Sequence, residues 1–270
     1  MIKVLICDLD GSLMNPSSGL YVKEEVKEKL IEIQKKGIQI VLNSARVFQG
    51  VHPLALQIQM DQFGGYVISS NGAHVYDVKK QKTVFEYPID KSLCTKLWNI
   101  TLNHHLAPGY TQPEYAVCHQ YTHGYQLDSF NCQIEYKVVD EPFYNGSICK
   151  FSVSDTKEKM DLYFDDCKRE MEQYDVLAIR STPYMADVIC SSVDKFKTCN
   201  RLLQELNISW QEVSSIGDGL SDVDCIKASK LGVTLENGKK ECKEVADMIV
   251  PSCYEDGCIE WLNFILKGSL

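Results

Sequence analysis

Residues 1–13 of the chain, MIKVLICDLDGSL, join an apolar run to two aspartates and a glycine. The run Val4–Ile6 is uninterrupted, as expected for a strand that is buried on both faces of a sheet. Asp8 and Asp10 end the run, so it is shorter than the apolar stretch of a secretory signal peptide. We therefore interpret these residues as the first strand of an α/β fold.

Strand and helix patterns alternate in the residues that follow. Apolar residues at spacings of four and three in a charged segment predict a helix over residues 23–36, which Gly37 ends. Residues 38–42 and 66–69 are further apolar runs that predict buried strands. This alternation predicts a doubly wound, mostly parallel sheet of the Rossmann-like kind, with right-handed crossovers.

The pattern changes in the middle of the chain and then resumes. Between residues 83 and 187, aromatic and polar residues alternate, and strands and helices follow one another less regularly. Beyond this segment, apolar runs at 213–216 and 231–234 again predict buried strands. We therefore predict an α/β core formed by residues 1–82 and 188–270, with an α+β domain of residues 83–187 inserted between its halves.

The composition excludes several classes of function. Lys and Arg total 28 and Asp and Glu total 37, so the net charge is −9, which argues against a nucleic-acid partner. No apolar run approaches the roughly 18 residues that span a bilayer, so we expect no membrane partner. The 12 cysteines include no Cys-x-x-Cys pair. We interpret them as reduced, buried thiols of a cytoplasmic protein.

Four polar segments stand where predicted buried strands end. They cover residues 8–13, 44–46, 70–73 and 217–222. In open α/β sheets, ligands bind at the carboxyl ends of the parallel strands. These segments therefore contain the candidate functional residues.

Four aspartates in these segments predict a cation site. They are Asp8, Asp10, Asp218 and Asp222. Converging carboxylates repel one another, and burial makes their charge costly without a cation. Oxygen ligands of this kind suit Mg²⁺, which takes few carboxylates from a protein and keeps several waters. Each aspartate alone also fits a simple turn, but the four together at matched strand ends favour the metal site.

Other residues of the same segments suit an anion. Ser44 follows a strand and offers a hydroxyl, Lys195 offers a compact positive charge, and Gly11 lets backbone N–H groups approach a ligand closely. Lys195 alone also fits a solvated lysine, as its neighbour Lys197 illustrates. Together with a metal, these groups fit a phosphoryl group, whose transfer needs mainly positioning and charge neutralisation.

These motifs resemble those of the haloacid dehalogenase-like phosphohydrolases. Residues 8–13 resemble the family's motif Asp-x-Asp-Gly-Thr/Ser-Leu, and residues 43–46 its second motif, in which Thr-Gly-Arg is more common. Residues 217–222 resemble the closing Gly-Asp-Gly-x-Asn-Asp, and residues 71–73 are similar to a marker of the Cof-like subfamily. That subfamily has a large inserted cap, and the resemblance implies that residues 83–187 form it.

The resemblance implies a role for each charged motif residue. Asp8 is the expected nucleophile, which forms an aspartyl-phosphate, and Asp10 is the expected general acid and then base. The implied Mg²⁺ ligands are one oxygen of Asp8, the backbone carbonyl of Asp10 and the carboxylate of Asp218. Asp222 is expected to order a metal-bound water or to position Lys195.

The remaining motif residues are expected around the phosphoryl group. By the resemblance, Ser44 and Lys195 hold its oxygens, and we expect backbone N–H groups near Gly11 to approach it. Arg46 and Asn71 are expected to line the substrate pocket.

Three residues depart from the family pattern. Ala45 replaces the glycine that is usual in the second motif, and Phe196 replaces the small residue after the motif lysine. Ser221 replaces the asparagine expected before Asp222. None of these changes removes a residue of the expected chemistry, so we expect them to affect the rate and the pocket shape.

The sequence therefore predicts a Mg²⁺-dependent phosphatase that hydrolyses a small phosphorylated metabolite, either a sugar phosphate or a phosphorylated cofactor. Two alternatives stay open. A phosphomutase would use the same aspartyl-phosphate and return the phosphoryl group to the sugar, and a weakly catalytic module would bind the metabolite without turnover. No motif names the substrate, and the sequence does not indicate the oligomeric state.

Overall fold

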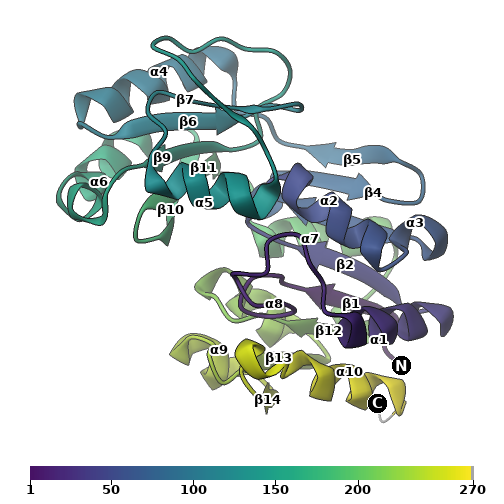
Figure 1. Cartoon of the computed structure of the whole chain (residues 1–270). Coiled ribbons are helices and arrows are strands. Elements are labelled where there is room, and N and C mark those ends of the chain that lie inside the picture. Colours follow the sequence, from purple (N-terminus) through teal and green to yellow (C-terminus); the bar gives the residue numbers. More distant parts are fainter. Residues whose placement is uncertain (269–270) are drawn as a thin grey trace. The chain divides into compact units, whose positions relative to one another are not determined.

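The computed structural model describes residues 1–268 and divides the chain into two compact units (Figure 1). The first unit combines Met1–Phe85 with the chain from Asp194 onward, and the second is Glu86–Val193. The chain therefore leaves the first unit once and returns to it once.

The predicted boundaries at residues 82 and 187 fall within strands. Residue 82 is the first of β5 (Lys82–Glu86), and residue 187 lies inside β11 (Met185–Cys190). β11 pairs antiparallel with β10 (Val176–Thr182) over its whole length, so it belongs entirely to the second unit. A hairpin of this kind depends on pairing between strands, which a local pattern does not reveal.

The first unit is built on a doubly wound sheet, as the sequence predicts. Among the described residues this sheet has eight strands, in the order β14-β13-β12-β1-β2-β3-β4-β5. The strands from β14 to β3 are parallel, and β4 is antiparallel to β3. Besides β5 they are β1 (Val4–Cys7), β2 (Gln39–Asn43), β3 (Gly65–Ser69), β4 (His74–Asp77), β12 (Val213–Ile216), β13 (Leu231–Leu235) and β14 (Met248–Val250).

Helices cover this sheet because the strands are apolar on both faces. Leu5 and Cys7 of β1 pack in the same cluster as buried residues of α1 and α10, while Val4 and Ile6, which point to the opposite face, are also buried. The helices are α1 (Glu24–Lys35), α2 (Phe48–Gln57), α3 (Met60–Phe63), α7 (Lys195–Glu205), α8 (Val223–Ala228), α9 (Lys240–Val245) and α10 (Cys258–Leu266). Short 3₁₀ helices are η1 (Ser70–Gly72), η2 (Trp210–Glu212), η3 (Leu220–Asp222) and η4 (Cys253–Glu255).

The second unit has the predicted α+β character and its own core. Within residues 86–193, six strands form a sheet in the order β10-β11-β9-β6-β7-β8, antiparallel except for the β7–β8 pair. Trp98, Phe151 and Phe164 lie in one buried cluster of this unit. Its other elements are α4 (Lys91–Asn103), β6 (Ala107–Thr111), β7 (Ala116–Cys118), α5 (His123–Cys132), β8 (Tyr136–Val138), β9 (Phe151–Ser154) and α6 (Lys157–Met171).

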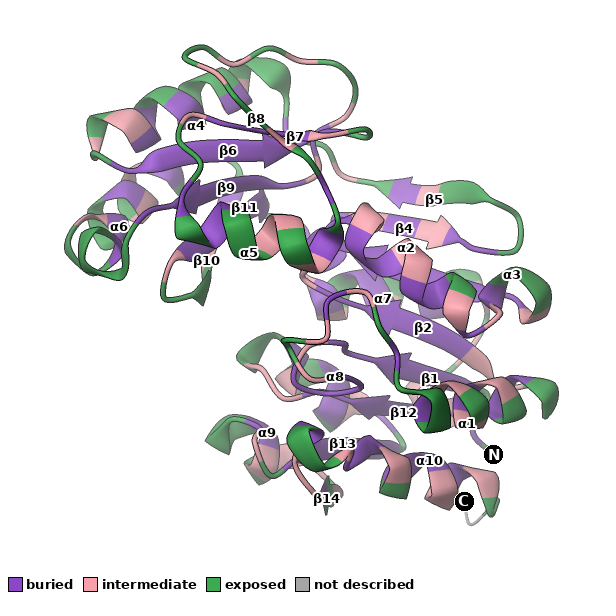
Figure 2. Cartoon of the chain, in the orientation of Figure 1, coloured by how far each residue is buried: buried purple, intermediate pink, exposed green. Residues whose placement is uncertain are grey.

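The burial pattern agrees with the interpretation of the cysteines. Figure 2 shows that most strands of both sheets are buried, while the helices expose one side. All 12 cysteines lie within the described residues and are free thiols, and all but Cys149 and Cys190 are buried.

In the described part of the chain, no helix has both the length and the apolar character needed to cross a bilayer.

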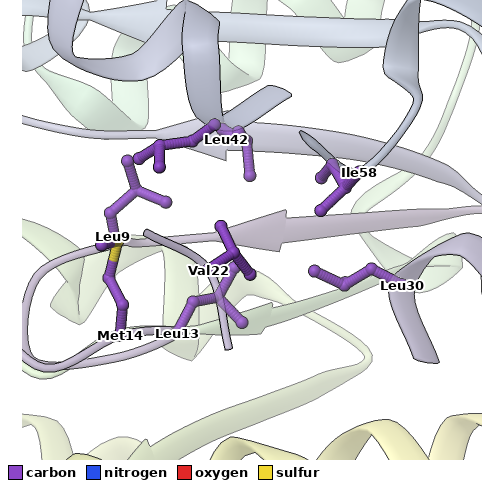
Figure 3. Close-up of a pocket in the computed structure, with 8 residues that line it drawn as sticks. Leu9, Leu13, Met14, Val22, Leu30, Leu42 and Ile58 are labelled. Carbon is purple, nitrogen blue, oxygen red and sulfur yellow. The ribbon is translucent and has the colours of Figure 1, made fainter. Parts of the chain in front are cut away.

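A small apolar cavity lies inside the first unit (Figure 3). The side chains that line it come from the loop after β1, from α1 and β2, and from α2 and the residue that follows it: Leu9, Leu13, Met14, Val22, Leu30, Leu42, Leu54 and Ile58. None of these eight side chains can donate or accept a strong hydrogen bond. We interpret the cavity as a packing gap in the core and not as a ligand site.

Candidate active site

The sheet topology brings two of the predicted site segments to one place. β1 and β12 are neighbours in the sheet, with Cys7 paired to Ile216. The strand that follows β1 and the strand that follows β12 lie toward opposite edges of the sheet. Such a switch point leaves a crevice at the carboxyl ends of the strands. Asp8 follows β1 directly, and Asp218 follows β12 after one glycine.

Three carboxylates cluster at this point. One oxygen from each of Asp8, Asp218 and Asp222 lies within 4.8 Å of the others. Asp8 and Asp222 are buried. Burial raises the pKa of Asp218 to about 7, and the charges of Asp8 and Asp222 add to this effect. Burial and then the charge of Asp8 raise the pKa of Asp222 to about 6, although Lys195 opposes the shift.

Lys195 reaches the same cluster from the start of α7. Its Nζ donates to Asp8 Oδ1 at 2.6 Å and to Asp222 Oδ1 at 2.8 Å. Asp194 caps the helix by accepting a hydrogen bond from the backbone N–H of Lys197, which fixes the first turn. Burial alone would lower the pKa of Lys195, but the charges of Asp222 and Asp8 outweigh it and raise the pKa.

The charge balance of the cluster suits a divalent cation. Three carboxylates and one ammonium group leave two negative charges uncompensated when all are ionised. Carboxylate oxygens are hard ligands of the kind that Mg²⁺ and Ca²⁺ prefer. We infer that the negative charge of this cluster fits a divalent metal beside Asp8 and Asp218, with Asp222 held by Lys195.

Gly11 is required by the crowded turn beside this cluster. Its φ is +87°, and a Cβ atom there would lie 2.4 Å from Asp218 Oδ2. Two residues that the sequence reasoning missed support the turn. Ser12 donates from Oγ to Asp218 Oδ1 at 3.3 Å, and Asn237 donates from Nδ2 to the Gly11 carbonyl at 2.8 Å. Ser12 lies within the motif of residues 8–13, whereas Asn237 follows β13 and belongs to no motif that would mark it as a site residue.

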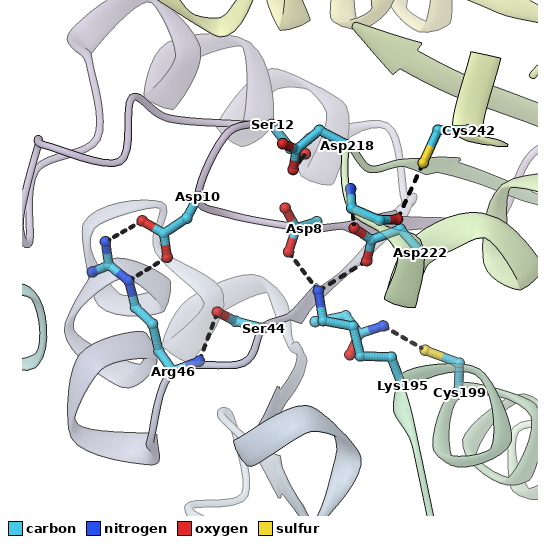
Figure 4. A network of polar contacts seen from close by, with 12 residues as sticks. Asp8, Asp10, Ser12, Ser44, Arg46, Lys195, Cys199, Asp218, Asp222 and Cys242 are labelled. Carbon is cyan, nitrogen blue, oxygen red and sulfur yellow. Dashed lines mark hydrogen bonds and ion pairs between the residues drawn. The ribbon is translucent and has the colours of Figure 1, made fainter. Parts of the chain in front are cut away.

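Asp10 does not join the other three carboxylates, contrary to the expectation that all four converge. Figure 4 shows its carboxylate turned toward Arg46 and away from Asp8. Arg46 Nε donates to Asp10 Oδ2 and Nη2 donates to Oδ1, both at 2.6 Å. Arg46, expected to line the pocket, is thus the partner of Asp10. The metal contact expected through the Asp10 carbonyl stays a prediction.

Ser44 and Asn71 lie together at the ends of β2 and β3. The backbone N–H of Ser44 donates to Ile68 at 2.9 Å, and the N–H of Asn71 donates to the Ser44 carbonyl at 3.2 Å. Ser44 Oγ accepts from the N–H of Arg46 at 3.1 Å, which orients its hydroxyl. Asn71 is buried and has left-handed backbone geometry, with φ of +54°.

The departures from the family pattern have local explanations in two cases. Phe196 stacks on Trp210, with ring centroids 5.3 Å apart, and so packs the first turn of α7 against η2. Ser221 is exposed, and Lys195 contacts Asp222 directly. The structure gives no reason for Ala45.

We expect added Mg²⁺ to raise the melting temperature more at about pH 8 than at about pH 5.5. Asp218 and Asp222 have pKa values raised above those of an unfolded chain, so their contribution to stability is present at low pH. It is lost as the pH rises through about 6 to 7, when both carboxylates ionise in the folded state. A divalent cation offsets the repulsion that results.

Thermal unfolding with MgCl₂, and with NaCl at the same ionic strength, measures this difference. The NaCl series removes the general effect of salt screening. An equal rise at both pH values would contradict the assignment of the cluster as a cation site.

Comparisons with known proteins show which family the chain matches. The family profile described as haloacid dehalogenase-like hydrolase matches residues 5–262. The 5-amino-6-(5-phospho-D-ribitylamino)uracil phosphatase YcsE of Bacillus subtilis is 21% identical and covers 95% of this chain and 92% of its own.

Two solved structures share the whole fold. A haloacid dehalogenase-like hydrolase from Bacteroides thetaiotaomicron has a TM-score of 0.87 and 26% identity, covering 98% of this chain and 100% of its own. The sugar phosphatase BT4131 has a TM-score of 0.78 and 17% identity, covering 97% of this chain and 98% of its own. Because the family match spans every segment that contributes to the site, the chain belongs to the haloacid dehalogenase-like hydrolases.

Proposed function

We propose that this protein is a Mg²⁺-dependent phosphatase that hydrolyses a small phosphorylated metabolite through an aspartyl-phosphate on Asp8. The observation that carries the proposal is the cluster of Asp8, Asp218 and Asp222 with Lys195 at the switch point of the sheet. The enzyme class is that of a phosphoric monoester hydrolase, in keeping with the family and the named activities of its relatives.

In this proposal the reaction proceeds by two successive displacements at phosphorus, in which Asp8 and Asp10 take part. Asp8 attacks through a carboxylate oxygen, an O–P bond forms, and the bond from phosphorus to the alcohol oxygen breaks. Asp10 gives its proton to that oxygen as it leaves. Water then attacks the aspartyl-phosphate, Asp10 takes a proton from the water, and inorganic phosphate leaves with Asp8 restored.

The other groups neutralise charge and hold the phosphoryl oxygens. A bound Mg²⁺ would withdraw charge from the phosphoryl group and reduce its repulsion with Asp8. Asp8, Asp218 and the carbonyl of Asp10 are its proposed ligands. Lys195, with Asp222 fixing its position at 2.8 Å, supplies the fixed positive charge beside the nucleophile. Ser44 and the backbone near Gly11 are the proposed donors to the remaining oxygens.

The substrate class is proposed from the relatives and from the inserted domain. YcsE is named for a phosphorylated ribitylamino compound and BT4131 for sugar phosphates. Both are small phosphate monoesters of alcohols. We assign the inserted domain, predicted at residues 83–187, as the cap that selects among such esters.

Phosphate release is the test of this proposal. We expect turnover of p-nitrophenyl phosphate, or of members of a panel of sugar phosphates and phosphorylated cofactors, with MgCl₂ and its loss with EDTA. Isomerised sugar phosphate with little free phosphate would identify a phosphomutase instead. Tight binding of a panel member without any turnover would identify a binding module.

A further inference from the structure

Arg46 holds the carboxylate of Asp10 in a fixed plane. Two parallel N–H···O bonds, each 2.6 Å long, join the guanidinium to both oxygens of Asp10. A bidentate pair of this kind fixes orientation as well as distance. Asp10 lies in the loop after β1, beyond Asp8, and its side chain is 32% exposed, so it would otherwise be free to turn toward solvent.

Arg46 is itself held from several sides. Its Nη1 donates to the carbonyl of Gly19 at 2.7 Å, its own carbonyl accepts from the N–H of Ser70 at 2.7 Å, and its N–H donates to Ser44 Oγ. Its side chain is only 5% exposed. The guanidinium therefore has little freedom to rotate, and its two hydrogen bonds fix the orientation of the Asp10 carboxylate.

We propose that Arg46 is a positioning residue that acts on the reaction through Asp10, an inference that rests on the proposed function. When Asp10 gives its proton to the leaving oxygen, negative charge develops on the carboxylate that faces the guanidinium. Arg46 stabilises that charge and keeps the carboxylate in the plane from which it next takes a proton from water. Arg46 needs no contact with the phosphoryl group for this role.

Comparing esters with different leaving groups distinguishes this role of Arg46 from a merely structural one. An alkoxide must be protonated as it leaves phosphorus, so hydrolysis of an alkyl phosphate depends on Asp10. A p-nitrophenolate leaves as a stable anion and needs little help from an acid. A residue that acts through Asp10 therefore affects alkyl phosphates strongly and p-nitrophenyl phosphate weakly.

The test compares kcat for both kinds of ester in Arg46→Lys and Arg46→Gln. Lysine keeps the charge but not the fork of two donors, and glutamine places no unpaired charge in the buried site. We expect both variants to lose about 10²-fold in kcat on an alkyl phosphate that the wild type hydrolyses, and less than about threefold on p-nitrophenyl phosphate. Arg169→Lys, at a surface position 78% exposed, is the matched control and should leave both rates unchanged.

A second arm uses Asp10→Asn as the background. If Arg46 acts through Asp10, adding Arg46→Lys to Asp10→Asn should cause no further loss, because interacting residues are not additive. Equal losses on both esters, or a further loss in the Asp10→Asn background, would overturn the inference. Wild-type protein that releases no phosphate from any ester would instead refute the proposed function, and the inference with it.

Discussion

Asp8→Asn is expected to reduce phosphate release by about 10⁴-fold or more, because the amide is too weak a nucleophile to form the aspartyl-phosphate. Asparagine has nearly the same shape as aspartate, and Lys195 keeps its contact with Asp222 at 2.8 Å. The substitution should therefore leave the fold intact. The expected loss lies in kcat, since the binding groups contributed by Ser44 and Lys195 are unchanged.

The measurement is steady-state phosphate release with MgCl₂, together with the melting temperature of each protein. Asp61→Asn, an equivalent change at an exposed position of α3, is the control and should keep full activity. A variant Asp8→Asn that folds normally and retains a tenth or so of the activity would exclude Asp8 as the nucleophile.

Lys195→Met is expected to destabilise the first unit by about 3–5 kcal/mol in the absence of metal. The substitution leaves Asp8 and Asp222 buried without their shared cation, next to Asp218. Removing one partner of a buried ion pair is far more destabilising than removing an exposed one. The same change removes the fixed positive charge at the nucleophile, so activity should fall by at least about 10²-fold.

Thermal unfolding in EDTA measures the loss of stability, and repeating it with MgCl₂ measures how far a cation restores it. Lys197→Met is the matched control two residues along the same helix. Lys197 is exposed and pairs with Asp194, so its loss should change stability by less than about 0.5 kcal/mol. Equal melting temperatures for the two variants would show that Lys195 does not offset the charge of the cluster.

The positions of β1, β2, β3, β12 and β13 and of most candidate site residues could be predicted because their signals are local, whereas β4, β5 and β14 were not predicted. An apolar run such as Val4–Ile6 has to be buried on both faces, and the polar residues after it then stand at the carboxyl edge of the sheet. The strand at β12 was predicted in the same way, but its place beside β1 is known only from the pairing of the strands in the structure. The interpretation of the cysteines as buried thiols holds for all but Cys149 and Cys190, which are partly exposed although they stand in apolar runs.

The pairing of side chains within the site was decided by tertiary structure alone. The sequence predicted four converging carboxylates, but Asp10 turns to Arg46 because that guanidinium, held by the Gly19 carbonyl, offers a donor to both oxygens. Asn237 supports the turn at Gly11 from more than two hundred residues away, and no local pattern marks it. Periodicity and motif spacing specify which residues reach the edge of the sheet. Which of them touch depends on distances that exist only once distant strands are paired.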